Sequence, residues 1–113
     1  MHPVHTLDEV MRKAKRIEHE QTRRESEDYL EMVMFLRSMR DIAQLLDDYF
    51  GPALKESGEE VEEEAEKLAN RYGGIARDQI LYHTQRDNAR QLAMLWPWSD
   101  GKRITVKIIQ EWE

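Results

Sequence analysis

One stretch decides the fold that the sequence predicts: residues 29–50, YLEMVMFLRSMRDIAQLLDDYF. Plotted at 100° per residue, its apolar side chains cover an arc of about 200°, roughly twice what one contact face needs. We therefore expect one helix that touches neighbours on two sides and forms the centre of the core, with Leu36 and Ile42 buried. Gly51-Pro52 ends this helix, since proline disfavours helical geometry in the residue before it and glycine suits the turn.

An amino-terminal helix is expected to begin just after a capping box at residues 6–9 (TLDE), where the threonine hydroxyl can accept from the third amide of the helix. Residues 18–28 (EHEQTRRESED) contain no strongly apolar side chain and should be exposed, with a second capping-box pattern at residues 22–25. Two arrangements remain open. Either a short helix over about 7–20 meets a second one, which is the interpretation we favour, or one helix of ~66 Å runs to Phe50 and needs a partner chain.

Two further helices are expected in the middle of the chain. Residues 57–60 (SGEE) are a third capping-box pattern, and a narrow apolar stripe follows as far as Tyr72. The glycine pair 73–74 suits the end of that helix. Apolar residues from Ile75 then continue as another helix to about Met94.

The carboxy-terminal tail has a different pattern. The aromatic segment 96–98 (WPW) precedes a turn signal at residues 99–102 (SDGK). Residues 103–112 (RITVKIIQEW) alternate apolar and polar side chains as a half-buried strand does. An apolar residue at every fourth position also fits a helix, but the β-branched residues favour the strand. That strand would pair with residues 95–98, where the proline requires an edge position, or with its copy in another chain.

These patterns predict a mainly α protein, a small bundle of about four helices with a short carboxy-terminal β strand or hairpin. The first helix is either joined to the second or separate from it. We expect residues 1–6 to be a flexible amino terminus, residues 7–95 the bundle, and residues 96–113 a tryptophan-rich tail with the β element. The 113 residues fit one domain. Only 40% are apolar and 35% are charged, so a partner chain supplying part of the core is a reasonable hypothesis.

The motifs of the common catalytic and metal-binding sites are missing from the sequence. There is no cysteine, which excludes a disulfide, a thiolate metal site and a cysteine nucleophile. The four histidines have neither His-Glu-x-x-His spacing nor carboxylates at metal-binding spacing, and the glycine pair 73–74 is not part of a phosphate-binding loop. We therefore expect a non-enzymatic protein with no catalytic residue, cofactor or metal.

Charge divides the sequence into a basic and an acidic stretch, while the net charge of −6 argues against general nucleic-acid binding. The basic stretch is either an arm for nucleic acid or an ordinary charged helix. The acidic run is either an imitation of a nucleic-acid backbone or a solvated helix face. A third interpretation lays the basic stretch of one copy along the acids of another. The candidate charged residues are Arg12, Lys13, Arg16, Arg23 and Arg24, and Glu59, Glu60, Glu62, Glu63 and Glu66.

An intermolecular interface is expected where the first helix has an apolar stripe and where the tail gathers all three tryptophans, because clustered tryptophans favour interfaces. These surfaces predict at least a dimer. The candidate interface residues are Leu7, Val10, Ala14, Ile17, Trp96, Trp98, Ile104, Val106, Ile108 and Trp112.

Together these features predict a non-enzymatic helical interaction, adaptor or regulatory protein that acts as a homo-oligomer. Its acidic or basic surface is also expected to suit another protein partner. One alternative is an acidic inhibitor that imitates DNA. Another is an accessory nucleic-acid binder that uses the basic helix, although nucleic acid is not the expected partner. Residues 1–5 do not resemble a secretory signal, and no apolar run approaches the ~18 residues of a membrane span. A cytoplasmic location without membrane contact is therefore expected.

Overall fold

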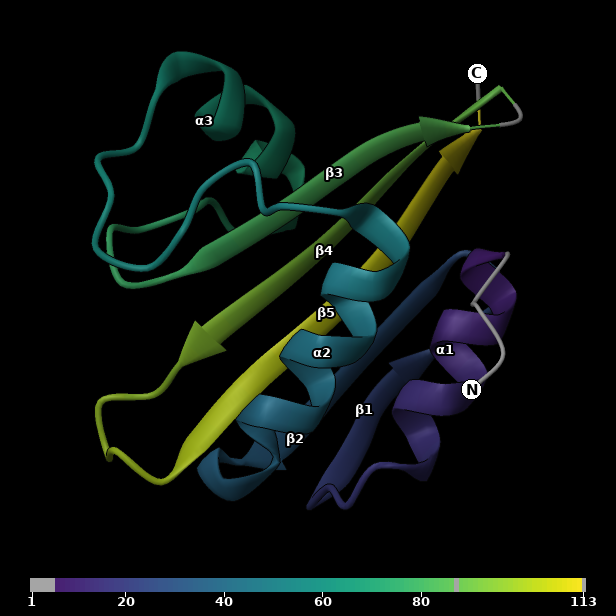
Figure 1. The fold of residues 1–113 in the computed structure, drawn as a ribbon, viewed down its shortest axis with the longest axis vertical. Coiled ribbons are helices and arrows are strands. Elements are labelled where there is room, and N and C mark those ends of the chain that lie inside the picture. Colours follow the sequence, from purple (N-terminus) through teal and green to yellow (C-terminus); the bar gives the residue numbers. More distant parts are fainter. Residues whose placement is uncertain (1–5, 87, 113) are drawn as a thin grey trace.

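Residues 6–86 and 88–112 are described by the structure, a computed structural model. Five strands form one antiparallel sheet in the order β1-β2-β5-β4-β3 (Figure 1). The strands are β1 (Gln21–Glu25), β2 (Tyr29–Phe35), β3 (Ile80–Arg86), β4 (Ala89–Pro97) and β5 (Arg103–Trp112). The helices are α1 (Leu7–Arg16), α2 (Met39–Phe50) and α3 (Glu63–Ala69), with one-turn helices η1 (Leu36–Ser38) and η2 (Asn70–Tyr72).

The sheet separates two clusters of buried side chains. The larger cluster lies between the sheet and the helices α1 and α2, which run across the front of the sheet in Figure 1. The smaller cluster lies on the opposite face, where Ala65 and Ala69 of α3 pack on Leu92 and Met94 of β4. The two helical layers therefore cover opposite faces of the sheet, and the second layer is the smaller.

The tail forms the central strand, β5, which pairs with β2 on one side and β4 on the other. The apolar residues of its alternating pattern face the core as predicted, since Ile104, Val106 and Ile108 belong to the cluster beneath α1 and α2. The strand interpretation of residues 103–112 is confirmed, and both strand partners belong to the same chain. Pro97 is tolerated because the pairing of β3 with β4 stops at Leu95, which leaves Pro97 only one strand neighbour.

The prediction of a mainly α helical bundle was wrong. The stretch on which it depended, residues 29–50, contains a strand and a helix. Residues 29–35 are β2, and only residues 39–50 form α2. The broad apolar arc arises because β2 is buried on both faces: Met32 and Met34 meet the helices, and Val33 is buried on the other face. Ile42 is buried as predicted, but the prediction for Leu36 was wrong, because its exposed fraction is 43%.

The amino-terminal helix begins where predicted, and the Oγ1 of Thr6 accepts from the amide of Glu9 at 3.1 Å. It ends at Arg16, so the unbroken helix is excluded. The polar segment 18–28 is largely exposed as expected, but its central residues form β1, an edge strand exposed along its whole length. The capping-box pattern at residues 22–25 therefore starts no helix.

The predicted helix from Ile75 to Met94 is a β hairpin. Asn88 adopts a φ of 63°, which reverses the chain between β3 and β4. Helix-forming residues such as Leu92 and Met94 are held in β4 by its pairing with two neighbouring strands, and this tertiary context overrides their intrinsic preference. The predicted boundary between bundle and tail also falls inside β4.

The third predicted helix is present but shorter. It begins at Glu63 without a side-chain cap, so the capping-box pattern at residues 57–60 lies in the preceding loop. Its end is close to the prediction, because the one-turn helix η2 follows α3 and Gly73 closes η2 with a φ of 102°. Residues 1–5 of the predicted flexible amino terminus lie outside the described residues.

Candidate interaction surface

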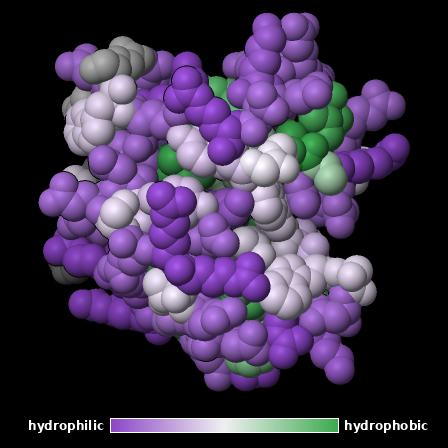
Figure 2. Space-filling model, turned by 180° about the vertical axis from the view of Figure 1, so that it is seen from behind, coloured by the Kyte–Doolittle hydropathy of each residue, from purple (hydrophilic) through white to green (hydrophobic). Residues whose placement is uncertain are grey.

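The second face of the sheet is only partly covered by α3. Beyond the helix, over β1, β2 and the adjoining parts of β4 and β5, aromatic side chains lie beneath cationic ones. Figure 2 shows this side, where pale residues of intermediate hydropathy lie among hydrophilic ones and hydrophobic residues appear only in small areas. We call this surface the cation–aromatic face. It comprises Arg23, Arg24, Tyr29, Phe35, Arg37, Tyr72, Trp96, Trp98, Arg103 and Lys107.

Cations and rings alternate in a row at the end of the sheet that carries the turn between β4 and β5. The Cζ of Arg37 lies 4.5 Å from the ring centroid of Phe35. Arg103 lies between two rings, with its Cζ 5.8 Å from Phe35 and 5.8 Å from Trp98. Arg23 completes the row at 5.4 Å from Trp98. These separations are in the range of cation–π attraction.

A second row lies closer to α3. Arg24 is 5.0 Å from the ring of Tyr29, and that ring lies 6.4 Å from the ring of Tyr72. The Nζ of Lys107 is 3.7 Å from the ring of Trp96 and donates to the carbonyl oxygen of Tyr72 at 2.7 Å. The buried ammonium of Lys107 therefore joins the central strand to the end of η2.

Strand alternation and the turn between β4 and β5 explain this arrangement. Odd-numbered residues of β5 face away from α1 and α2, which places Arg103 on the same side as Thr105. The indole of Trp98 donates to the Oγ1 of Thr105 at 2.8 Å, and its position is fixed by that bond. Asp100 accepts from the amide of Lys102 at 2.8 Å, and this bond, with those from Arg103, lowers the pKa of the Asp100 carboxyl.

Carboxylates keep the face close to electrical neutrality. Three of its guanidinium groups have acidic partners: Arg23 lies 3.9 Å from Glu31, Arg37 is 2.6 Å from Glu18, and Arg103 is 3.0 Å from Glu20. Exposed pairs of this kind contribute little to stability. Their main effect is therefore to orient the guanidinium groups over the rings and to reduce the attraction for polyanions.

A cleft of about 350 Å³ lies at one end of the face, between η1 and the turn that precedes β5. Phe35 and Leu36 supply its apolar lining, and Arg37, Lys102 and Arg103 surround them. Among the residues that the structure describes, Lys102 makes no side-chain ion pair, whereas both arginines do. The cleft therefore combines exposed apolar surface with one cation that is free to meet an external carboxylate.

The predicted interface residues separate into two groups. Six of them come together in the core of the single chain and are not available to a partner. Ile17 packs at the margin of that core, and Trp96 and Trp98 are half-buried on the cation–aromatic face. Trp112 is 60% exposed at the end of β5. The six core residues are Leu7, Val10, Ala14, Ile104, Val106 and Ile108.

The predicted basic stretch is divided between two elements. Arg12, Lys13 and Arg16 lie on α1, whereas Arg23 and Arg24 belong to β1 and stack on the aromatic rings. Phe35 and Arg37 were missed because residues 29–50 were interpreted as one helix. Arg103 and Lys107 lie in the strand that was predicted, but the neighbouring strands that carry the rings they contact were not predicted.

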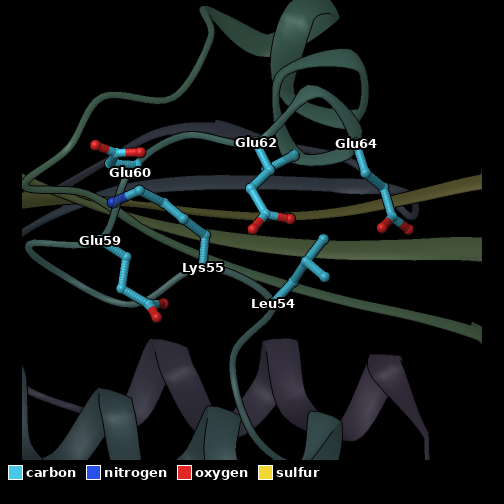
Figure 3. A pocket seen from close by; sticks show the side chains of 7 residues that line it. Leu54, Lys55, Glu59, Glu60, Glu62 and Glu64 are labelled. Atoms are coloured by element: carbon cyan, nitrogen blue, oxygen red, sulfur yellow. The ribbon is translucent and has the colours of Figure 1, made fainter.

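Three of the predicted acidic residues, Glu59, Glu60 and Glu62, line a smaller cavity of about 160 Å³ beside α3. Figure 3 shows Glu62 and Glu64 pointing from the start of the helix toward Leu54, with Glu59 and Glu60 on the loop near Lys55. The Nζ of Lys55 donates to the carbonyl oxygens of residues 56, 77 and 79, so the buried lysine closes the loop onto the chain before β3. Of the other two predicted acids, Glu63 and Glu66, both lie on α3 and both are exposed.

His83 carries a pH-dependent contribution to stability. Its Nε2 is buried without a hydrogen-bond partner among the described residues. Burial, followed by the charge of Arg90, lowers the pKa of His83 below 6.5, and Glu64 acts in the opposite direction. Between the folded pKa and 6.5 the unfolded chain binds more protons, so stability is complete above pH 6.5 and falls as the pH is lowered.

We expect the loss of unfolding free energy between about pH 8 and about pH 5 to be smaller in His83→Phe than in the wild type. Urea denaturation of both proteins at the two pH values measures this difference. Equal losses in the two proteins would show that His83 does not titrate differently on folding.

Within residues 6–86 and 88–112, no helix is long and apolar enough to cross a membrane. The same part of the chain contains no cluster of three or more histidine, aspartate or glutamate side chains that could hold a metal ion. Comparisons of the sequence with protein-family models and with curated proteins, and of the structure with solved structures, found no match.

Proposed function

We propose that the protein is a non-enzymatic interaction protein, an adaptor or regulator, that contacts another protein chain through the cation–aromatic face. The observation that carries this proposal is the pair of rows in which arginine and lysine side chains lie over tryptophan, tyrosine and phenylalanine rings. Arginine and aromatic residues are enriched in protein–protein interfaces and dominate their binding energy. The side chains are also held in place before binding, which reduces the entropy lost on association.

A protein partner suits this face better than nucleic acid does. A phosphate backbone would approach Arg23, Arg37 and Arg103 only against the carboxylates that already pair with them. The net charge of −6 adds a general repulsion. A folded protein, in contrast, can stack on the rings and accept hydrogen bonds from the guanidinium groups without removing their acidic partners.

The acidic inhibitor is less well supported than the interaction protein. Its carboxylates would have to form one continuous surface, but they belong to elements on opposite faces of the sheet. Glu63 and Glu66 lie on α3, whereas Asp41 and Asp48 lie on α2. A cytoplasmic location is part of our proposal, and the lack of cysteine is compatible with it.

Affinity capture from the native host, followed by binding measurements with the purified partner, tests the proposal. We expect Trp98→Ala combined with Arg103→Ala to weaken binding at least about tenfold, because truncation of a central anchor typically costs more than about 1.4 kcal/mol. Arg40→Ala, an exposed substitution on α2, is the control and should bind like the wild type. Equal binding by all three proteins, or capture that nuclease treatment abolishes, would contradict the proposal.

A further inference from the structure

Among the described residues, Trp112 is the most exposed large apolar residue, and it lies at the opposite end of β5 from the cleft. It is 60% exposed, although its Nε1 donates to the Oδ1 of Asp28 at 3.0 Å. The same oxygen accepts from the Nε2 of Gln110 at 3.2 Å, and Asp28 makes no ion pair within the described part of the chain. Glu27, in the same turn, is exposed and likewise has no ion pair there. Trp112 is therefore an apolar projection with an acidic margin.

The cleft has the complementary character. Leu36, with an exposed fraction of 43%, and Phe35 form its apolar lining. Arg37 and Arg103 at its margin already have acidic partners, so Lys102 is the cation there that makes no ion pair among the described residues. An aromatic side chain next to a carboxylate would fill the apolar lining and bring its charge to Lys102. The apolar lining of the cleft thus suits the ring of Trp112, and the positive charge of Lys102 suits the carboxylates beside that ring.

One chain cannot satisfy its own cleft. Arg103 and Trp112 are the first and last residues of β5, and a strand of this length extends about 30 Å at ~3.3 Å per residue. Figure 1 shows the two ends of β5 at opposite sides of the molecule. Within this chain Trp112 cannot reach the cleft, whereas the Trp112 of another copy can.

We propose that Trp112 of one copy inserts into the cleft lined by Phe35, Leu36 and Lys102 of the next, so that the protein assembles head to tail. This proposal rests on the proposed function, since the cleft is one end of the cation–aromatic face, and it names a second copy as a partner. The contact joins two different surfaces, so each added copy leaves one projection and one cleft unused. Assembly therefore continues into a chain or closes into a ring.

Mixing two variants tests the arrangement. Trp112→Ala removes the projection and keeps the cleft, whereas Leu36→Glu combined with Lys102→Glu disables the cleft and keeps the projection. Light scattering over ~10–300 µM should show mass rising with concentration for the wild type and a monomer for each variant alone. An equimolar mixture should reach the mass of two copies and no more, because only one productive contact is possible.

Lys67→Glu is the matched control, since it reverses a charge on α3, far from the cleft, and should associate like the wild type. Thermal melts of all variants establish that they are folded. A wild type that stays monomeric at every concentration, or a mixture that stays monomeric, overturns the head-to-tail contact. If the wild type is monomeric but still binds a captured partner through Trp98 and Arg103, the proposed function is retained and only the head-to-tail contact is refuted. A variant that forms dimers alone would also overturn the contact, because it requires an interface between identical surfaces.

Discussion

Replacing Ile108 with alanine is expected to lower the free energy of unfolding by about 2–5 kcal/mol, the range for truncation of a fully buried aliphatic side chain. Ile108 lies in the central strand, where it pairs with Leu30 of β2 and Ala93 of β4. Its side chain belongs to the cluster beneath α1 and α2 and has no exposed surface. Truncation therefore leaves a cavity where two strands and the helical layer meet.

Leu36→Ala serves as the control for Ile108→Ala. Because Leu36 is 43% exposed, its truncation should change the unfolding free energy by less than about 1 kcal/mol. Urea denaturation of both variants at low protein concentration provides the comparison. A larger loss for Leu36→Ala than for Ile108→Ala would agree with the helical bundle expected from the sequence and contradict the sheet.

Gly73→Ala is expected to be strongly destabilising for two separable reasons. The φ of 102° lies in the left-handed region, which costs a residue with a side chain about 1–3 kcal/mol. In addition, an added Cβ would lie 2.5 Å from the Cη2 of Trp96, and forcing that ring to move costs about 1–3 kcal/mol. The ring cannot move freely, because Lys107 lies 3.7 Å from it.

Gly74→Ala separates these two contributions. Its φ is 85°, but an added Cβ would meet no atom within 4 Å. It should therefore lose only the conformational part, and the difference between the two variants measures the contact of Gly73 with Trp96. Thermal and urea denaturation both report this difference. Equal losses in the two variants would mean that Trp96 does not pack against Gly73.

Parts of the fold were predictable because their signals are local. The capping box at Thr6 predicts the start of α1, and Gly51-Pro52 predicts the end of α2. The alternation of residues 103–112 predicts a strand, and the turn at residues 99–102 is also local chemistry, since Asp100 accepts from two amides that follow it. Each feature depends on interactions within a few residues.

The remaining strands depend on contacts that the sequence does not display. Residues 21–25 form an edge strand that is exposed on both faces, so their sequence shows no apolar alternation. The strand β2 is held extended by pairing with β5, which lies far along the chain. Residues 89–97 contain helix-forming side chains that the sheet holds extended from both sides. Residues 4–50 contain no glycine or proline, which suits a long helix, but strands tolerate the same composition.

The candidate site was predictable only in part, for the same reason. Trp98 was identified from the clustering of tryptophans, and Arg23 and Arg24 from the charge of their segment. Their contacts with rings on other strands required the order β1-β2-β5-β4, which places residues separated by about seventy positions side by side. Trp112 was predicted as an interface residue, and its role in assembly remains a prediction.

If copies of this chain meet through Trp112 and the cleft at the end of the cation–aromatic face, dilution should change the amide chemical shifts on both surfaces. We predict concentration-dependent shifts at two places, around Asp28 and Trp112 and around Leu36 and Lys102, with none on the outer surface of α2. Shifts confined to only one of these places, or centred on α2, would contradict the head-to-tail contact.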